Sequence, residues 1–443
     1  MKTLVDSIDA GAQPSIAEFV AALGDVIPAM LQLESTPQDP EWHAEGNVFI
    51  HTGMVLDALY ELLATRAASV VGPRRTALIL AAALHDVAKP LTTRPMEIRG
   101  VQRIAAPRHE MRARSILSLL LMEQGLEYRL VERVADLVGY HVAPKFLVVK
   151  GRERGAYLRL AQAADPELLY WLELADMIGR TCADQAKQIE HIEMFGLFAR
   201  EYGAWRRFAD EAPAWRAMFR DQVEGSDALQ DLSHGQYIHD LCNGTVSQPE
   251  EGIARSYRFR DGFPQLVVTV GPSGSGKSTW IERHLEDHVC ISLDEIRGEL
   301  GGRSEQSRNG EVRRIAREQL REGLRRNRKI VWDATSLRRD FRDSLTSLAA
   351  DYGALVTIVC FPRAPRTYHR RNRERDNPVP AGVLDGQLEA LQWPSRAEAH
   401  RWLVVDEDGE ALAYYGGLQE ALPYGVAPSR DVLREWDGEA VVR

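Results

Sequence analysis

Apolar positions along the chain follow two different periods, and the change between them falls a little past the midpoint. From residue 1 to about 245 the apolar residues recur every three or four positions, the period of amphipathic helices, as in Met54, Val55, Leu59 and Leu62. From Tyr257 onward, short apolar runs alternate with helical segments. The pattern predicts an all-α first part and an α/β second part.

The apolar runs of the second part predict four strands, at Leu266–Val270, His288–Ser292, Ile330–Asp333 and Leu355–Phe361. Runs of this kind, separated by helices, are typical of a parallel sheet that helices cover on both faces. A further pair of short strands is expected at Trp402–Asp406 and Ala411–Tyr415, followed by a tail to Arg443.

The turn formers of Asn243–Gly252, NGTVSQPEEG, mark a break between the two parts. We therefore expect a helical domain at 1–245, a linker at 246–258 and an α/β domain at 259–443.

Composition narrows the class of protein. The chain has 443 residues, of which 44% are hydrophobic and 27% charged, as in globular domains. No apolar run approaches the ~20 residues of a membrane span, and the N-terminus lacks the pattern of a signal peptide. Four cysteines lie far apart without a C-x-x-C motif, which favours free thiols in a reducing compartment. A cytoplasmic protein without a membrane partner is expected.

The net charge of −9 disfavours a surface that is basic throughout, but a local basic cluster exists. Arg313, Arg317, Arg321 and Arg325 recur at i+4 along a predicted helix. Such a cluster can bind phosphates, because these contacts need grouped cations rather than a basic average. It can equally be a solvated helix face balanced by glutamates. The pattern leaves both interpretations open.

The segment Gly271–Thr279, GPSGSGKST, follows a predicted strand and precedes a predicted helix. Its spacing fits the phosphate-binding loop G-x-x-x-x-G-K-[ST]. Glycines let backbone N–H groups turn onto phosphate oxygens, and the helix N-terminus adds positive potential. Lys277 is expected to reach the outer phosphates of ATP or another NTP, and the Ser278 hydroxyl to hold Mg²⁺. The predicted nucleotide-binding residues are Gly271, Pro272, Ser273, Gly274, Ser275, Gly276, Lys277, Ser278 and Thr279.

Asp294 and Arg297 lie three residues apart where the second strand turns into a helix, so both can project into one crevice. A carboxylate there can accept a proton from an attacking hydroxyl, and an arginine can hold a phosphate in bidentate fashion. The alternative is an ordinary N-cap aspartate beside an exposed arginine.

Polar residues interrupt the apolar stripes of several predicted helices in the first part. Burying so many imidazoles and carboxylates without a common partner would be costly. A divalent transition metal is the partner that suits neutral imidazole and carboxylate. The predicted ligands are His51, His85, Asp86, His109, His141 and Asp176.

The order His51, His85-Asp86, Asp176 resembles the H…HD…D signature of HD phosphohydrolases, and His109 and His141 match the extra ligands of dinuclear members. The phrases HTGMVLD, ALHDVAKP, RHE and ELADMIGR are similar to the HD module that follows bacterial CCA-adding transferases. The resemblance, over about 45–180, implies metal-assisted phosphoester hydrolysis with one or two ions such as Mn²⁺, Ni²⁺, Co²⁺ or Fe²⁺.

Cations near this signature are candidates for binding the substrate phosphate. Lys89 follows the HD pair, and Arg180 follows Asp176 by four residues. Each can contact phosphate oxygens or remain a surface cation. His43 and Glu45 are candidates for the entrance of the site.

GPSGSGKSTW and SLDEIRGEL resemble the P-loop and the D-x-x-R motif of the 5′-hydroxyl polynucleotide kinases of phage and bacterial RNA repair, over about 262–395. This resemblance assigns Lys277, Asp294 and Arg297 to catalysis. It implies an arginine lid within RTYHRRNRERDNPVP, with Arg371 and Arg375 as candidates and Arg370 and Arg373 as rivals. Asp333 matches an aspartate at the end of the third core strand and is a further candidate for Mg²⁺.

Together the two parts resemble bifunctional bacterial end-healing enzymes with an all-α HD domain followed by an α/β P-loop kinase domain. The resemblance implies RNA ends, or DNA ends, as substrates. It implies hydrolysis of 2′,3′-cyclic, 2′- and 3′-phosphates, NTP-dependent phosphorylation of 5′-OH ends, and coupling to an RNA ligase. Two alternatives remain: a nucleoside or small-metabolite kinase fused to an HD nucleotidase, and an ATP-gated RNA-binding protein whose HD site is structural.

Overall fold

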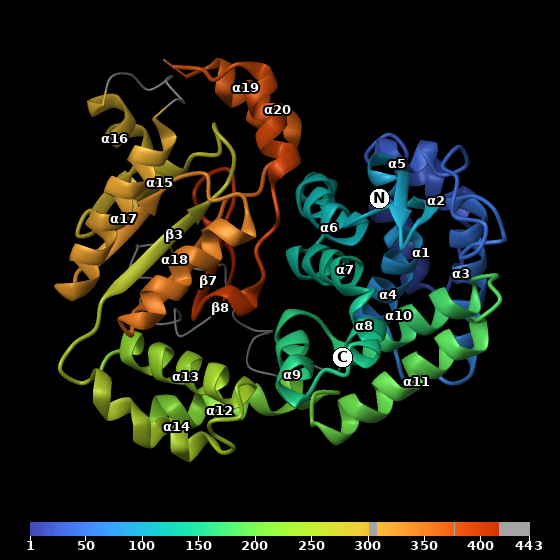
Figure 1. Cartoon of the computed structure of the whole chain (residues 1–443), viewed down its shortest axis with the longest axis horizontal. Coiled ribbons are helices and arrows are strands. Elements are labelled where there is room, and N and C mark those ends of the chain that lie inside the picture. The colour runs from blue at the N-terminus through green and yellow to red at the C-terminus, as the bar shows by residue number, and fades with distance from the viewer. Residues whose placement is uncertain (301–307, 376, 416–443) are drawn as a thin grey trace. The chain divides into compact units, whose positions relative to one another are not determined.

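A computed structural model describes residues 1–300, 308–375 and 377–415, apart from the side chains of residues 207–209. The predicted C-terminal tail lies outside these residues. The chain forms two compact units, Met1–Phe208 and Ala209–Arg443, which are described separately (Figure 1).

The first unit is helical and packs around α10, whose residues are almost all buried. α10 starts at Asp165, which accepts hydrogen bonds from Glu167 N and Leu168 N, and Pro166 occupies the first turn. The unit consists of α1 (Lys2–Asp9), α2 (Ile16–Leu23), η1 (Pro28–Gln32), α3 (Val48–Ala64), α4 (Gly72–Leu84), α5 (Lys89–Thr92), β1 (Arg94–Ile98), β2 (Val101–Ala105), α6 (His109–Leu120), η2 (Leu121–Gln124), α7 (Tyr128–Tyr140), α8 (Ala143–Val149), α9 (Arg154–Ala163), α10 (Pro166–Ile178) and α11 (Gln185–Glu201).

The antiparallel hairpin β1–β2 was not expected in this helical half. Its residues alternate only between exposed and intermediate positions, so it lacks the apolar face that announces a strand in a sequence.

The second unit contains a six-stranded sheet with the order β4-β5-β3-β6-β7-β8. All neighbouring strands pair in parallel except β7 and β8. Its elements are α12 (Arg207–Gln222), α13 (Asp227–Cys242), α14 (Pro249–Arg255), η3 (Ser256–Phe259), β3 (Gln265–Val270), α15 (Lys277–His284), β4 (Val289–Ser292), α16 (Leu293–Glu299), α17 (Asn309–Arg325), β5 (Lys329–Asp333), α18 (Arg339–Asp351), β6 (Leu355–Cys360), α19 (Pro365–Arg373), α20 (Ala381–Ala390), η4 (Arg396–Glu398), β7 (Arg401–Val405) and β8 (Ala411–Tyr415).

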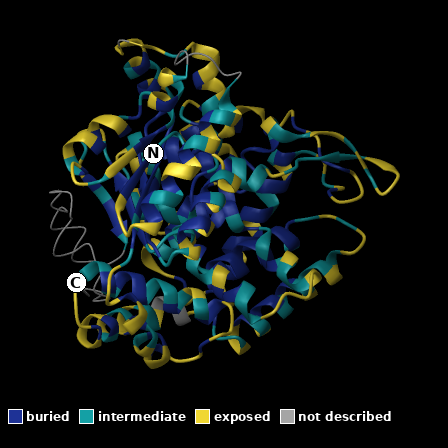
Figure 2. Cartoon of the chain, turned by 60° about the vertical axis from the view of Figure 1, so that its left-hand side comes forward, coloured by how far each residue is buried: buried dark blue, intermediate teal, exposed yellow. Residues whose placement is uncertain are grey.

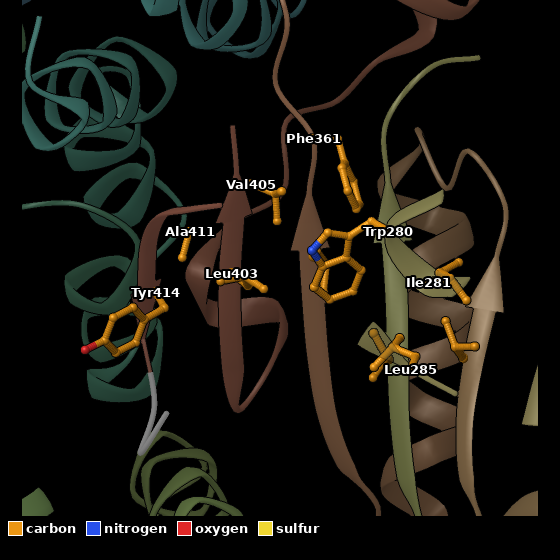
Figure 3. Close-up of a cluster of buried hydrophobic side chains, with 11 residues drawn as sticks. Trp280, Ile281, Leu285, Phe361, Leu403, Val405, Ala411 and Tyr414 are labelled. Carbon is orange, nitrogen blue, oxygen red and sulfur yellow. The ribbon is translucent and has the colours of Figure 1, made fainter. Parts of the chain in front are cut away.

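The predicted fold class is confirmed: a helical unit precedes an α/β unit with a mostly parallel sheet. Buried residues concentrate in the strands and on the inner faces of the helices (Figure 2). Trp280 of α15 packs against Phe361 at the end of β6, with 5.8 Å between ring centroids (Figure 3). This apolar cluster fixes the helix that follows the phosphate-binding loop.

The segment expected to be a linker, 246–258, differs from that expectation, because it forms α14 and η3. α13 also lies with the second unit rather than the first: Asp231 forms a buried ion pair with Arg401 of β7 at 2.5 Å. The periodic pattern predicted that α13 is helical, but such a pattern carries no information about which neighbour covers an apolar face.

Two candidate active sites

The predicted metal ligands of the first unit converge from five helices. His51 lies on α3, His85 and Asp86 follow α4, and His109 begins α6. His141 follows α7, and Asp176 lies in the last turn of α10. They form two groups whose ligand atoms lie within 4.8 Å of one another: His51 with His85 and Asp176, and Asp86 with His109 and His141. The two groups adjoin, because His85 Nε2 lies 3.2 Å from Asp86 Oδ2.

Backbone carbonyls orient three of these histidines in the same way. Nδ1 of His85, His109 and His141 lies 2.7–2.9 Å from a carbonyl oxygen three residues earlier in the chain. A ring that donates through Nδ1 presents an unprotonated Nε2 at its other side, which is the usual arrangement of a metal-binding histidine. The backbone thereby leaves the Nε2 lone pair of each of these three histidines available to bind a metal.

The site fits a bound metal because buried imidazole nitrogens face its carboxylates without forming hydrogen bonds. Nε2 of His51, His85 and His109 is buried without a hydrogen bond, and in each ring it lies 3.1–3.2 Å from an oxygen of Asp86 or Asp176. Buried polar atoms of this kind are rare and call for an ion or water. These imidazole and carboxylate donors suit the transition metals predicted from the sequence.

The protonation states also suit metal binding. Burial lowers the pKa of His141 to about 3, so its ring is neutral near pH 7. Burial alone would raise the pKa of Asp86, but the charges of His85 and Lys89 hold it well below its usual value. His141 therefore offers neutral imidazole beside the ionised carboxylate of Asp86, as divalent ions require.

Lys89 and Arg180 lie against the ligand carboxylates. Lys89 Nζ is 2.6 Å from Asp86 Oδ2, and Arg180 Nη2 is 2.9 Å from Asp176 Oδ1. Both cations thus offset negative charge beside the centre. Their predicted contact with a substrate phosphate stays a prediction.

Two further glutamates lie at this site. The sequence motifs suggested Glu45 only as a candidate for the entrance, and they did not indicate Glu173. Glu45 Oε1 lies 2.9 Å from His51 Nδ1, so it supports the one ligand histidine that is not oriented by a backbone carbonyl. Burial and the neighbouring negative charge of Asp176 raise the pKa of Glu173 well above its usual value. Glu173 precedes Asp176 by three residues on α10, and that helical spacing is the only sequence signal that places it at the site.

The second site forms at the carboxyl ends of the parallel strands, where the loop after β3 leads into α15. Gly274 and Gly276 adopt φ angles of +81° and +94°, which favour glycine. Lys277 Nζ donates to the carbonyl oxygens of Gly271 and Pro272 at 2.8 and 2.9 Å. Burial lowers the pKa of Lys277 to about 8.

The predicted Mg²⁺ ligands of this site are adjacent. Ser278 Oγ lies 3.1 Å from Asp333 Oδ2, at the end of β5. Burial raises the pKa of Asp333, although Lys277 and Ser278 oppose the shift. A hydroxyl and a carboxylate in contact form a suitable oxygen pair for Mg²⁺.

Two helices from the C-terminal part of the chain cover the loop. Gln387 of α20 accepts a hydrogen bond from Ser273 N at 2.7 Å. A Cβ placed on Gly274 would lie 3.2 Å from Tyr368 O of α19. Tyr368 in turn donates to Phe361 O at 2.7 Å, which fixes α19 to the end of β6. No motif in the sequence indicated Gln387.

Asp294 and Arg297 form an ion pair of 2.5 Å on α16. The N-cap of this helix is Ser292, whose side chain accepts from Glu295 N. Asp294 is therefore free of the capping role that the sequence left open. Its side chain is 70% exposed, whereas that of Arg297 is 18% exposed. The carboxylate can receive a substrate group, while the guanidinium is held by its surroundings.

The lid candidates lie at the loop to different extents. A Cβ placed on Gly276 would lie 3.6 Å from Arg371 Nη1, so this arginine reaches the loop. Arg371 Nη2 also donates to Glu407 O at 3.0 Å, in the β7–β8 turn. Arg375 is close enough that its charge contributes to lowering the pKa of Lys277. Arg370 lies near Glu407 as well, and Arg373 is exposed.

Among the helices that the structure describes, none combines the length and the apolar character needed to cross a bilayer.

Two family models match the segments that hold the two sites. The family model of the HD domain matches residues 48–167, and a family model of the AAA domain matches residues 266–394. A gluconokinase from Sinorhizobium meliloti 1021 is similar at 27% identity, over 33% of this chain and 83% of that chain, with a TM-score of 0.26. No curated protein matches the chain. The chain thus carries an HD domain, the type found in metal-dependent hydrolases, followed by a P-loop domain of the kinase type.

Proposed function

We propose that the chain heals broken RNA ends, and DNA ends as a second substrate class. The HD site removes 2′,3′-cyclic, 2′- or 3′-phosphates, and the P-loop site transfers the γ-phosphoryl group of an NTP to a 5′-OH end. The observation that carries this proposal is the Asp294–Arg297 pair, free of the capping role, in a unit that also holds a P-loop. An acceptor with a hydroxyl next to a phosphate suits this pair, because the carboxylate can bind the hydroxyl and the guanidinium the phosphate.

In the kinase reaction, the loop amides and Lys277 bind the β- and γ-phosphates, and Ser278 with Asp333 would hold Mg²⁺. Asp294 orients the 5′-hydroxyl and accepts its proton. The 5′-oxygen forms a bond to the γ-phosphorus while the bond from that phosphorus to the β-γ bridging oxygen breaks, and the NDP leaves. Arg297 binds the phosphate on the 3′ side of the terminal nucleotide. Arg371 and Arg375 stabilise the charge on the transferred group.

In the hydrolytic reaction, His51, His85, Asp86, His109, His141 and Asp176 would hold one or two divalent ions, and a bound ion supplies an activated water and polarises the phosphate. Lys89 and Arg180 bind phosphate oxygens from the side of the ligand carboxylates. The products of the two reactions, a free 3′-end and a 5′-phosphate, are the ends that an RNA ligase joins.

The test is one assay of 5′-OH RNA and 2′,3′-cyclic phosphate RNA across a panel of Mn²⁺, Ni²⁺, Co²⁺, Fe²⁺ and Mg²⁺. Lys277→Ala and Asp294→Ala should abolish labelling of the 5′-OH end and leave the phosphoesterase intact. Asp86→Ala should do the reverse. Turnover of free nucleosides or small metabolites, with no phosphorylation of any oligonucleotide, would overturn the proposal. Equal loss of both activities in folded single-site variants would contradict two separate sites.

A further inference from the structure

Helix α17 carries an apolar face and a charged remainder. Its buried residues Val312, Ala316 and Leu320 form the face toward the sheet. Arg313 and Arg317 flank that face, whereas Arg314, Arg321 and Arg325 lie on the outer side of the helix, beside the glutamates at 311, 318 and 322. The sequence alone left this helix open between a phosphate-binding surface and a solvated face, and the contacts of the arginines now distinguish the two halves.

The arginines of the C-terminal half are neutralised within the helix. Arg321 pairs with Glu318 at 3.2 Å, and Arg325 lies 3.9 Å from both Glu318 and Glu322. Arg326, just past the helix, pairs with Glu322 at 2.5 Å. This half behaves as a solvated face.

The N-terminal half is different. Arg313, Arg314 and Arg317 are exposed, and none of them forms an ion pair with another residue that the structure describes. The only glutamate of this half, Glu311, pairs with Arg308 at 2.8 Å. Positive charge that is not offset by the helix itself therefore gathers at one end.

That end adjoins the proposed acceptor site. α17 belongs to the connection between the parallel strands β4 and β5, so its direction is opposite to theirs. The first turn of α17 therefore lies at the end of the sheet where the carboxyl ends of these strands lie. α16 and α17 pack together (Figure 1). Asn309, the first residue of α17, accepts a hydrogen bond from Arg297 Nη2 at 3.4 Å. The exposed arginines thus follow Asn309, which contacts Arg297, the residue proposed to bind the first phosphate of the acceptor.

We infer that Arg313, Arg314 and Arg317, here called the α17 basic track, bind backbone phosphates of the acceptor strand beyond its terminal nucleotide. The inference rests on the proposed function. Arg313 and Arg317 lie about one helical turn apart, roughly 5.4 Å along the axis, and Arg314 follows Arg313 directly. This spread suits successive phosphates of one strand rather than a single small anion. On a chain of net charge −9, such a local track supplies the cations that a polynucleotide needs and a small-metabolite kinase does not.

The experiment compares 5′-OH acceptors of increasing length: a nucleoside 3′-monophosphate, a trinucleotide and a decamer. The triple variant Arg313→Gln, Arg314→Gln, Arg317→Gln should raise the KM of the decamer at least tenfold. Three lost phosphate contacts should also reduce the slope of log(1/KM) against log salt by about 2. The KM values of the nucleoside 3′-monophosphate and of the NTP should not change. The matched control, Arg321→Gln with Arg325→Gln, removes cations that are already paired and should leave all acceptors unaffected.

If the wild-type kinase is active and the triple variant has an unchanged KM for the decamer, the inference about the α17 basic track is wrong, whereas the proposed function stands. An equal rise for the mononucleotide also overturns the inference, because the track would then act on the site itself. Wild-type protein that phosphorylates no oligonucleotide overturns the proposed function together with the track. The single variant Arg317→Glu serves if the triple variant does not fold, and should raise the decamer KM by at least threefold.

Discussion

Glu45 supports the HD site through more contacts than any motif would suggest. Its carboxylate lies 2.9 Å from His51 Nδ1 and 2.8 Å from His43 Nδ1, and it accepts a hydrogen bond from Thr181 N at 2.9 Å. Burial would raise the pKa of Glu45, but the hydrogen bonds from His43 and His51 lower it far below the usual value. The group stays a carboxylate and can hold His51 Nδ1–H, which turns Nε2 toward Asp176.

Replacing this carboxylate should weaken metal binding without removing a ligand. We expect Glu45→Gln to lower the affinity of the HD site for Mn²⁺ about 10- to 100-fold, the usual cost of losing a partner of a ligand histidine. Titration of the metal-free protein with Mn²⁺, followed by calorimetry, measures this directly. Glu34→Gln, an exposed residue of the same unit, is the control. Equal affinity in the two variants would contradict a supporting role for Glu45.

The residues of both sites were predictable to unequal degrees, for a physical reason. His85-Asp86 and Gly271–Thr279 are short segments whose chemistry depends on fixed local spacing, so the sequence alone identifies them. Glu45 and Gln387 act through contacts with His51 and Ser273, and the Gln387 contact spans 114 residues. No spacing rule encodes a contact of that kind, because it depends on how the helices pack.

At the scale of elements, the phosphate-binding loop is enclosed between α15 and the pair α19–α20. The enclosure is tight at Gly274, since an added Cβ would lie 3.2 Å from Tyr368 O and 3.3 Å from Asn372 N. A non-glycine residue at a φ of +81° is also strained by about 1–2 kcal/mol. The close contact requires the loop or α19 to shift by a few tenths of an ångström, and the backbone strain adds to the cost.

We therefore expect Gly274→Ala to raise the KM for NTP at least tenfold and to lower the kinase kcat, while the HD phosphoesterase keeps its rate. Steady-state kinetics of both reactions check this. Gly382→Ala on α20 is the matched control, because an added Cβ there meets no atom within 4 Å. A Gly274→Ala enzyme with wild-type kinetics would show that α19 is not held against the loop.

At the scale of the whole molecule, buried polar residues connect α13 to β7 in the second unit. We call this group, Asp231, His234, His400 and Arg401, the polar seam. Asp231 pairs with Arg401, and His400 Nδ1 accepts a hydrogen bond from Val356 N at 2.9 Å. His234 lies nearby on α13. Burial lowers the pKa of His234 to about 3 and that of His400 to about 4.

The seam predicts that acid destabilises the second unit. Between pH 6.5 and about 4 the unfolded chain binds protons at His234 and His400 and the folded chain does not, so the free energy of unfolding falls as pH falls. Each histidine should cost about 2 kcal/mol at pH 5.

Residual kinase activity after heating, measured at pH 7 and pH 5, tests this prediction. His400→Gln retains an acceptor for Val356 N but cannot titrate, so it should lose less stability between the two pH values than the wild type. His239→Gln, at an exposed position of α13, is the control. The prediction is wrong if His400→Gln and the wild type lose the same stability.

The fold as a whole was predictable from hydrophobic periods, but the partners of α12–α14 were not. The strands at Leu266–Val270 and Leu355–Phe361 were expected within a residue of β3 and β6. α12 and α13 were expected in the first part, and α14 lies within the segment expected to be a linker. An amphipathic face does not identify the surface that covers it. Asp231 and Arg401 became recognisable as partners only once α13 and β7 were in place.

The Asp231–Arg401 pair spans 170 residues, and this has a consequence for the order in which the chain matures. During synthesis α13 leaves the ribosome long before β7. The Asp231 carboxylate therefore has no Arg401 to pair with until the last strands of the sheet have been made. A recombinant fragment that starts at residue 259 would strip α13 from the sheet and leave Arg401 buried without its partner, which is strongly destabilising. A fragment that starts after Trp205 would keep the pair and is the natural unit in which to isolate the kinase.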